Sequence, residues 1–427
     1  MVLSVGMSAR HRPGIRYDDG VVFAAALMVR VAYMAMVGPS FEGPYWIVAG
    51  DWLGKTSARA LGIVPTDFEP LYPAFLALVR VVAGDRPFVA QLVQTVIAAC
   101  GAVIFARLTR AVAGERVSWC AAALYVCDPL LVKQSGEDAP FVLVALVVVG
   151  FVAAVAERRS LAATALGTAL LVSSRIAALP LVACGVLLLL HRHDRVRATL
   201  VGAAAVATLI VSASVTGVWW PTRSGWNLYI ASLPAASELA PVYDADALEP
   251  YAAAFVERQS AAGNRPLTDL DADRALTRAA LSIFAADPGH ALVGRFENLW
   301  HFFWPPLVPL MTRGEGAVVE IDSRGHLVSV RGGAARPRLE RVVYVPYYSM
   351  ILAAAVGGVL MRWRRWSGAD SLFVAAVATF ALVHGLYFPG TRYRGPVECV
   401  FLFYAGVVAE RLARRLAPSH PSTATAA

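Results

Sequence analysis

Long apolar runs, separated by short segments rich in Arg, recur from about residue 20 to residue 410. A helix of about 17–22 apolar residues matches the hydrocarbon thickness of a bilayer. Hydrophobic residues make up 58% of the chain and charged residues 16%, which is more apolar surface than one soluble core can bury. The pattern predicts an all-α polytopic membrane protein with about ten transmembrane helices. The predicted spans are 20–38, 87–106, 117–133, 139–156, 161–174, 176–190, 198–218, 342–361, 369–387 and 396–410.

The Arg residues between the runs predict the orientation of the chain. The basic clusters are 10–16, 107–116, 158–159, 192–197, 362–365 and 411–415. All of them fall on one side if the apolar stretch 71–84, too short for a comfortable span, lies along the outer interface. The positive-inside rule then places both termini in the cytoplasm of a multi-pass protein of the plasma (inner) membrane. Because these clusters account for the net charge of +8, we expect no nucleic-acid partner.

Two polar segments are predicted to lie outside the membrane, the first external loop 39–86 and the longer segment 219–341. Within the second, 247–259 and 270–286 have helical patterns. The stretch 318–330 alternates around a polar DSRG, which is typical of a β-hairpin. The predicted organisation is a membrane module 1–218, an external mixed α/β loop domain 219–341, C-terminal membrane helices 342–412 and a disordered tail 413–427.

Three Arg residues next to the spans are candidates for phosphate binding. Arg175 stands between two apolar runs, where an unpaired charge is costly. Arg392 and Arg394 lie in a short external turn, against the positive-inside trend. A guanidinium can hold a lipid phosphate through paired hydrogen bonds as well as through charge.

Several acids on the same predicted side are candidates for catalysis. A carboxylate there can act as general base toward an acceptor hydroxyl or amine. Each acid also has a structural explanation. Glu42 can simply end the first span in water, and Asp51 fits a solvated helix face. Glu137 and Asp138 can begin the fourth span, where acids suit a helix N-terminus.

The order of these features resembles the GT-C membrane glycosyltransferases, in particular the protein O-mannosyltransferases and the lipid A aminoarabinose transferase. Members carry an acidic motif in the first outer loop, then an interface helix, then a span that ends in a basic cluster. FEGPYW, EPLYPAFLALV and ARLTRAVAGER stand in those places here. Further matches are SGEDAPF, SRIAALP, GWNLYIASLP and RYRGP. The resemblance covers the chain from about 20 to 410.

The resemblance implies inverting transfer of a sugar from a polyprenyl-phosphate donor to a lipid, glycan or protein acceptor outside the membrane. It implies catalytic roles for Glu42 and Asp138. It also implies substrate contacts by Tyr45, Glu137, Arg175, Arg392 and Arg394. The usual catalytic Asp of the family is Phe41 here. Either Glu42 has taken the role of base, or Asp51 or Glu69 has replaced it, or the protein no longer catalyses.

Two other functional classes remain open at this stage. A lipid or solute transporter, or a flippase, is expected to carry charges near mid-span and related halves. No internal repeat is evident, and the charges collect at one face. A non-catalytic GT-C-like membrane protein is the other alternative. No cofactor is expected, and no metal, because the sequence has no His/Asp cluster with metal-ligand spacing.

Overall fold

The structure is a computed structural model of the chain, and it describes residues 17–38, 43–219, 221–239, 245–304, 318–332, 338–387 and 391–416. Nearly all of the regular structure is helical. The helices of the N-terminal half are α1 (Tyr17–Val37), α2 (Pro44–Trp52), α3 (Leu71–Ala83), α4 (Pro87–Ala113), α5 (Glu115–Cys127), α6 (Pro129–Ser135), α7 (Phe141–Ala156), α8 (Leu161–Ser174), α9 (Leu179–His191) and α10 (Arg195–Thr216). The remaining elements are α11 (Arg223–Ser232), α12 (Ala235–Leu239), α13 (Glu249–Ala262), α14 (Asp269–Ala286), α15 (Pro288–Phe303), β1 (Val318–Ile321), β2 (Leu327–Arg331), α16 (Arg338–Arg362), α17 (Gly368–Leu386) and α18 (Gly395–Leu416).

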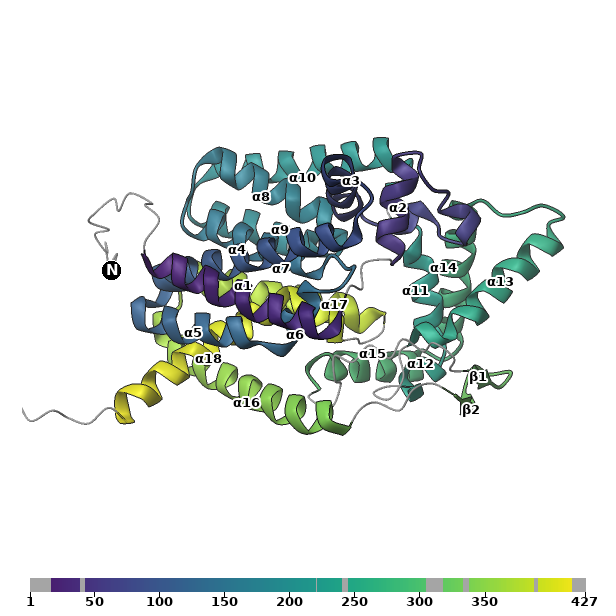
Figure 1. Cartoon of the computed structure of the whole chain (residues 1–427). Coiled ribbons are helices and arrows are strands. Elements are labelled where there is room, and N and C mark those ends of the chain that lie inside the picture. The colour runs from purple at the N-terminus through teal and green to yellow at the C-terminus, as the bar shows by residue number, and fades with distance from the viewer. Residues whose placement is uncertain are drawn as a thin grey trace, which may run out of the picture.

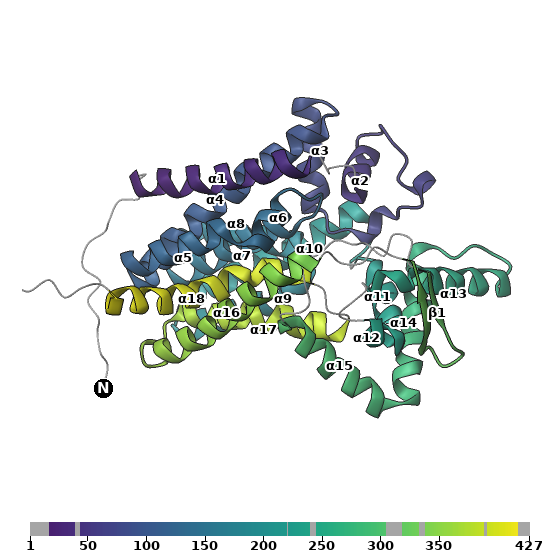
Figure 2. The same cartoon turned by 60° about the horizontal axis from the view of Figure 1, so that its bottom comes forward.

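The longer helices run side by side and form a bundle (Figures 1 and 2). The first residues of α1 and the last residues of α18 lie at one end of this bundle. Helices α11 to α15 and the hairpin β1–β2 lie at the opposite end (Figure 1), where α15 also packs against α17. We call this set the external unit, after its predicted location. The predicted division into a membrane module and an external loop domain remains a prediction.

Each predicted span is helical, but the lengths differ. Five described helices are long and apolar enough to cross a membrane by length and composition, namely Asp18–Val37, Pro87–Ala113, Arg195–Thr216, Val342–Arg365 and Gly368–Leu386. Helices α7, α8 and α9 are apolar but shorter. At 14 residues α8 measures about 21 Å, less than the hydrocarbon core. Ten crossings therefore remain a prediction, whereas an all-α fold with several membrane-length helices is confirmed.

The span predicted at 117–133 is broken at Asp128 into α5 and α6. Pro129 has no backbone N–H and cannot continue the hydrogen bonding of α5, so it starts a new helix. The side chain of Asp128 caps that helix by accepting a hydrogen bond from the backbone N–H of Leu131 at 2.8 Å. The prediction of one continuous span was wrong at this point.

The basic helix ends gather at one end of the bundle. Arg107, near the end of α4, donates two hydrogen bonds to Asp19 at the start of α1, at 3.0 and 2.8 Å. Arg192, after α9, donates to the carbonyl of Ala156 at the end of α7, at 3.2 Å. A Cβ at Gly368, where α17 begins, would collide with Arg192. The predicted clusters 107–116, 192–197 and 362–365 thus share one end, whereas the cluster 10–16 lies outside the described residues. Which compartment this end faces remains a prediction.

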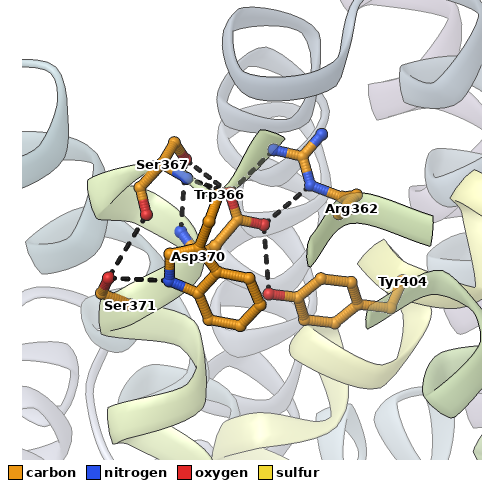
Figure 3. Close-up of polar contacts among 6 residues, drawn as sticks. All are labelled: Arg362, Trp366, Ser367, Asp370, Ser371 and Tyr404. Atoms are coloured by element: carbon orange, nitrogen blue, oxygen red, sulfur yellow. Dashed lines mark hydrogen bonds and ion pairs between the residues drawn. The ribbon is translucent and has the colours of Figure 1, made fainter. Parts of the chain in front are cut away.

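A buried ion pair ties α16, α17 and α18 together at this end (Figure 3). Arg362 donates from Nε and Nη2 to the two carboxylate oxygens of Asp370, at 2.7 and 2.8 Å. Tyr404 donates to the same carboxylate at 3.2 Å, and the backbone N–H of Ser367 donates at 2.8 Å. Ser367 and Asp370 together form a capping box at the start of α17. We call this set the inner ion pair.

The external unit has its own core, and its elements follow the sequence patterns. Helices α13 and α14 confirm the two helical stretches, and β1 and β2 pair antiparallel as the predicted hairpin. Tyr251 fixes the hairpin to α13, because its hydroxyl donates to the carbonyl of Val319 at 2.7 Å and accepts from the N–H of Ile321 at 3.1 Å. The predicted mixed α/β character is confirmed.

Helix α3 matches the predicted interface stretch. It has 13 residues, or about 20 Å, which is short for a span. It packs against α2 at the end of the bundle that carries the external unit (Figure 2). Arg80 of α3 is buried, and it donates to the carbonyl of Trp46 at 2.7 Å and lies 4.4 Å from the Trp46 ring centre. Helices α2 and α3 therefore form a rigid part of the first external loop.

Candidate functional site

The carboxylate of Asp138 lies against the start of α2. Its Oδ2 accepts a hydrogen bond from the backbone N–H of Trp46 at 3.1 Å. The N-cap residue of α2 is Gly43, which has no side chain to cap the helix, so Asp138 satisfies this donor from 92 residues away. A Cβ at Gly43 would lie 2.7 Å from Oδ2, so the backbone approaches the carboxylate as closely as glycine allows.

Glu69 and Arg175 form an ion pair beside α2, called here the outer ion pair. Within the described residues, both hydrogen bonds of the Arg175 guanidinium start from Nη1 and end on the two Glu69 oxygens, at 3.2 and 3.1 Å. The two side chains are 15% and 13% exposed. Arg175 follows α8 in an extended conformation, and its guanidinium lies 5.6 Å from the ring centre of Phe141.

Aromatic rings join these two sets of charges. Tyr45 of α2 packs edge-on against Phe68 and Tyr72, with ring centres 4.7 and 5.0 Å apart. Burial raises the pKa of Tyr45, and the nearby charge of Arg175 partly opposes that rise. Glu69, Asp138 and Tyr393 also act electrostatically on the Tyr45 hydroxyl. The predicted residues Tyr45, Asp138 and Arg175 therefore share one site.

Glu137 lies at the rim of this site. Its carboxylate is 3.7 Å from the ammonium of Lys133, and both side chains are largely covered. Two glutamines of α4 hold the turn that carries it. Gln94 donates to the carbonyl of Glu137 at 2.8 Å, and Gln91 donates to that of Gly136 at 2.9 Å. Gln91 and Gln94 therefore hold the turn between α6 and α7, which also carries Asp138.

The two Arg residues of the RYRGP turn have different surroundings. Arg394 is fully buried, donates to the carbonyl of Phe302 at 3.3 Å and to the hydroxyl of Tyr344, and lies 3.7 Å from the carboxylate of Glu398. Arg392 lies in the 3₁₀ helix Thr391–Arg394, and its side chain is outside the described residues. Arg394 therefore points toward α15 and α16, and its predicted contact with phosphate remains untested.

Tyr393, between these two arginines, brings the turn to the site. Its ring centre is 6.1 Å from that of Phe141, the same ring over which Arg175 lies. It also stacks on His384 at 4.1 Å. The structure thus brings the Tyr393 side chain of the RYRGP turn near Arg175, although the Arg394 side chain turns away.

Two acids near the ends of α2, Glu42 and Asp51, were weighed as bases from the sequence. Glu42, the predicted base, lies outside the described residues, but it is the covalent neighbour of Gly43. Asp51 was predicted to lie on a solvated face, and it is half-buried, where its Oδ1 accepts from the backbone N–H of Ala58 at 3.0 Å. Asp51 therefore stabilises the loop after α2. Among the described contacts, none joins Asp51 to Asp138.

Sequence reasoning overlooked the glutamines that support the site, and it treated Glu69 only as a departure from a motif. The signal for the glutamines was present, because Gln91 and Gln94 are polar residues three apart in an apolar run. The pairing of Glu69 with Arg175 crosses 106 residues, and no local pattern indicates it. Among the residues that the structure describes, no group of three His, Cys, Asp or Glu side chains could hold a metal ion.

Comparison with known proteins supports the resemblance seen in the motifs. Residues 65–220 match the family described as dolichyl-phosphate-mannose-protein mannosyltransferase. The matched segment contains Glu69, Asp138 and Arg175. The resemblance to GT-C membrane glycosyltransferases is thereby confirmed for this part of the chain. No curated protein sequence matches the chain.

Solved structures show a distant overall likeness. The archaeal oligosaccharyltransferase AglB from Archaeoglobus fulgidus, in complex with an inhibitory peptide and a dolichol-phosphate, has 13% sequence identity and a TM-score of 0.48, and the match covers 95% of this chain and 52% of that one. ArnT from Cupriavidus metallidurans bound to undecaprenyl phosphate has 13% identity and a TM-score of 0.39, covering 94% and 81%. This chain spans about half the length of the archaeal enzyme.

Proposed function

We propose that this protein is a membrane glycosyltransferase that moves a sugar from a polyprenyl-phosphate donor to an acceptor on the external face of the membrane. The observation that carries the proposal is the convergence of Asp138, Tyr45 and the outer ion pair at one end of the bundle. All but Tyr45 lie within the segment that matches the mannosyltransferase family. The site combines acids for proton removal with a cation for a leaving phosphate.

Glu42 is the proposed general base. It is bonded to Gly43, whose backbone lies against Asp138, and the Cα atoms of consecutive residues are about 3.8 Å apart. The base removes the proton from the acceptor hydroxyl or amine, and the acceptor atom then attacks the anomeric carbon of the sugar. The bond from that carbon to the phosphate oxygen breaks, and its electron pair leaves with the lipid phosphate. Attack opposite to the leaving group inverts the anomeric configuration.

Arg175 is proposed to stabilise the negative charge that grows on the leaving phosphate. Preorganised cations and donors at such a position are usually among the largest contributions to catalysis. Arg392 is proposed to reach the same phosphate from the RYRGP turn. Arg394 is proposed to contact phosphate as the sequence indicates, or to act by holding that turn through Tyr344 and Glu398.

The external unit is proposed to cover the site and to contact the acceptor. Its α11 approaches the first loop directly, because Thr222 donates from its backbone N–H to the carbonyl of Thr66 at 3.1 Å and from its hydroxyl to Asp67 at 2.7 Å. An acceptor lipid, glycan or protein would reach the site beside this contact. The basic end of the bundle is proposed to face the cytoplasm of a plasma membrane protein, and both chain termini are proposed to lie in that compartment.

Transfer of labelled sugar from a polyprenyl-phosphate donor tests this proposal. Asp138→Asn keeps an oxygen that can accept from Trp46 but removes the charge, so we expect turnover to fall about 10²-fold. Asp51→Asn is the matched control, because its amide oxygen can still accept from Ala58, and it should keep nearly normal turnover. Absence of transfer from every polyprenyl-phosphate sugar tried, by a folded wild-type protein, would reject the proposed function.

A further inference from the structure

One side of helix α15 is buried against the bundle. Gly294, Asn298 and Phe302 follow one another at intervals of four, which places them on the same side of the helix, and all three are buried. Asn298 donates from its side-chain amide to the carbonyl of Tyr387 at the end of α17, at 2.9 Å. Phe302 belongs to the main core of the bundle. This side therefore fixes α15 to the end of α17.

Another side of the same helix is apolar and exposed. Its large side chains, called here the α15 stripe, are Leu292, Val293, Phe296 and Trp300, which are 59%, 55%, 62% and 63% exposed. These four positions fall within an arc of about 100° around the helix axis. Single apolar side chains on a protein surface need no partner, whereas a contiguous set of large ones marks an interaction surface.

The α15 stripe continues the apolar surface of a membrane-length helix. Leu299, next to Trp300, packs on α17, because a Cβ at Gly385 would lie 3.4 Å from the Leu299 Cβ. Helix α17 is long and apolar enough to cross a membrane, and its Leu382 and Leu386 are 59% and 56% exposed. Figure 2 shows α15 leaving the end of α17 at an incline to the axis of the bundle. The stripe therefore begins where the lipid-facing surface of α17 ends.

We propose that the α15 stripe docks onto the surface of the bilayer and holds the external unit against the membrane. The bilayer is the partner because the stripe adjoins a helix that lipid already surrounds. An amphipathic helix with Trp, Phe and Leu on its apolar side suits the boundary between headgroups and acyl chains. Asn298 and the stripe then position α15 together, one from the bundle and the other from the lipid. The inference is independent of the proposed transferase activity.

Fluorescence quenching in nanodiscs tests where the stripe lies. Dansylalanine, a fluorescent amino acid, replaces Phe296 in the full-length protein, and each disc holds one copy in phosphatidylcholine. We expect quenching by doxyl groups on the lipid chains, emission at shorter wavelength and little quenching by aqueous iodide. Position 297 is the matched control, because Glu297 is exposed and lies about 100° away around the helix axis at nearly the same height. We expect iodide to quench a label there.

The same measurement at position 292 gives a second label on the stripe. It should behave as the label at position 296 does, and it replaces that variant if the protein does not fold. Lipid quenching at the stripe no stronger than at position 297 would overturn the inference. Protection from iodide that appears only when two copies share a disc would assign the stripe to self-association and would also overturn it.

Trp300→Asp tests whether the stripe holds α15 to the membrane. A carboxylate is costly to bring into the bilayer boundary, so we expect lipid quenching of the label at position 296 to decrease in this variant. His290→Asp is the control, because His290 is exposed on α15 outside the stripe, and quenching there should stay as in the parent protein. Unchanged quenching in folded Trp300→Asp would reject the holding role of the stripe.

Discussion

The two Arg–carboxylate pairs at opposite ends of the bundle are built differently. In the inner ion pair, two nitrogens of Arg362 reach the two oxygens of Asp370, and Tyr404 and Ser367 bind the same carboxylate (Figure 3). Its side chains are 10% and 0% exposed. In the outer ion pair, Arg175 uses one nitrogen for both oxygens of Glu69, at 3.2 and 3.1 Å, and Glu69 also lines a small open hollow.

This difference separates an interaction that holds helices together from one that can exchange its partner. The inner ion pair has short, parallel hydrogen bonds and additional donors, so breaking it leaves a charge buried with no replacement. The outer ion pair has longer hydrogen bonds, and Glu69 also lines a small open hollow. The same two residue types therefore serve stability at one end and, in our proposal, phosphate binding at the other.

The largest expected effect concerns the outer end. Arg175→Gln removes the cation proposed to stabilise the leaving phosphate, and we expect turnover of a polyprenyl-phosphate donor to fall about 10²–10³-fold. Thermal unfolding in detergent should shift less than in Asp370→Ala, because the Gln amide can still donate to Glu69, which lines an open hollow. A variant that unfolds early but keeps its turnover when folded would make the outer ion pair structural, like the inner one.

The inner end should respond in the opposite way. Asp370→Ala leaves the Arg362 charge buried and unpaired, and we expect the free energy of unfolding to fall by about 3 kcal/mol. Glu115→Ala, which removes a half-exposed partner of Arg110, should cost at most about 1 kcal/mol and serves as the control. Equal stability of the two variants would contradict the comparison. Turnover per folded molecule should be unchanged in both.

The smallest expected effect concerns the contact between the first loop and the external unit. Burial raises the pKa of Asp67, although the hydrogen bond from Thr222 and the charge of Arg223 lower it in part. A raised folded-state pKa means that the folded protein holds this proton more tightly than the unfolded chain. The contribution of Asp67 to stability is therefore fully present below its ordinary pKa, about 3.9, and is lost as the pH rises through the folded-state pKa.

Hydrogen exchange at the Thr222 amide measures this contact, because that amide donates to the carbonyl of Thr66. Its protection factor, corrected for intrinsic exchange, should fall by a few-fold between pH 4 and pH 7. Asp67→Asn should remove this pH dependence, since an amide does not titrate. A protection factor that rises with pH in the wild type would show that the Arg223 charge outweighs burial.

Most of the fold could be predicted because the signals are local. Run length, the Arg residues at alternate helix ends and the alternation around DSRG each depend on neighbouring residues, and the helices and the hairpin follow them. The break at Asp128 also has a local signal, the dipeptide Asp128-Pro129. The prediction of one span gave more weight to the hydrophobicity of the whole run. Where each described helix of the bundle begins and ends depends on packing, which run length does not encode.

The site could be predicted only in part, because its contacts join residues far apart in the chain. Residue types next to spans made Tyr45, Asp138 and Arg175 candidates, and the structure brings these three side chains near one another. The role of Asp138 as a cap for α2 depends on Gly43, and no single-sequence pattern links the two. Arg394 was grouped with Arg175 because both border spans, whereas its partners come from α15, α16 and α18.

The central claim is that an acid at the start of α2 acts as the base for sugar transfer, and Glu42→Gln tests it most directly. The measurement is single-turnover transfer from a polyprenyl-phosphate donor whose binding to the variant has first been verified. Gln keeps the size and hydrogen bonding of Glu but cannot remove a proton. We expect transfer to slow by about 10²–10⁴-fold with donor binding nearly intact. Near-normal transfer by Glu42→Gln, together with loss of transfer by Asp51→Asn, would contradict this account.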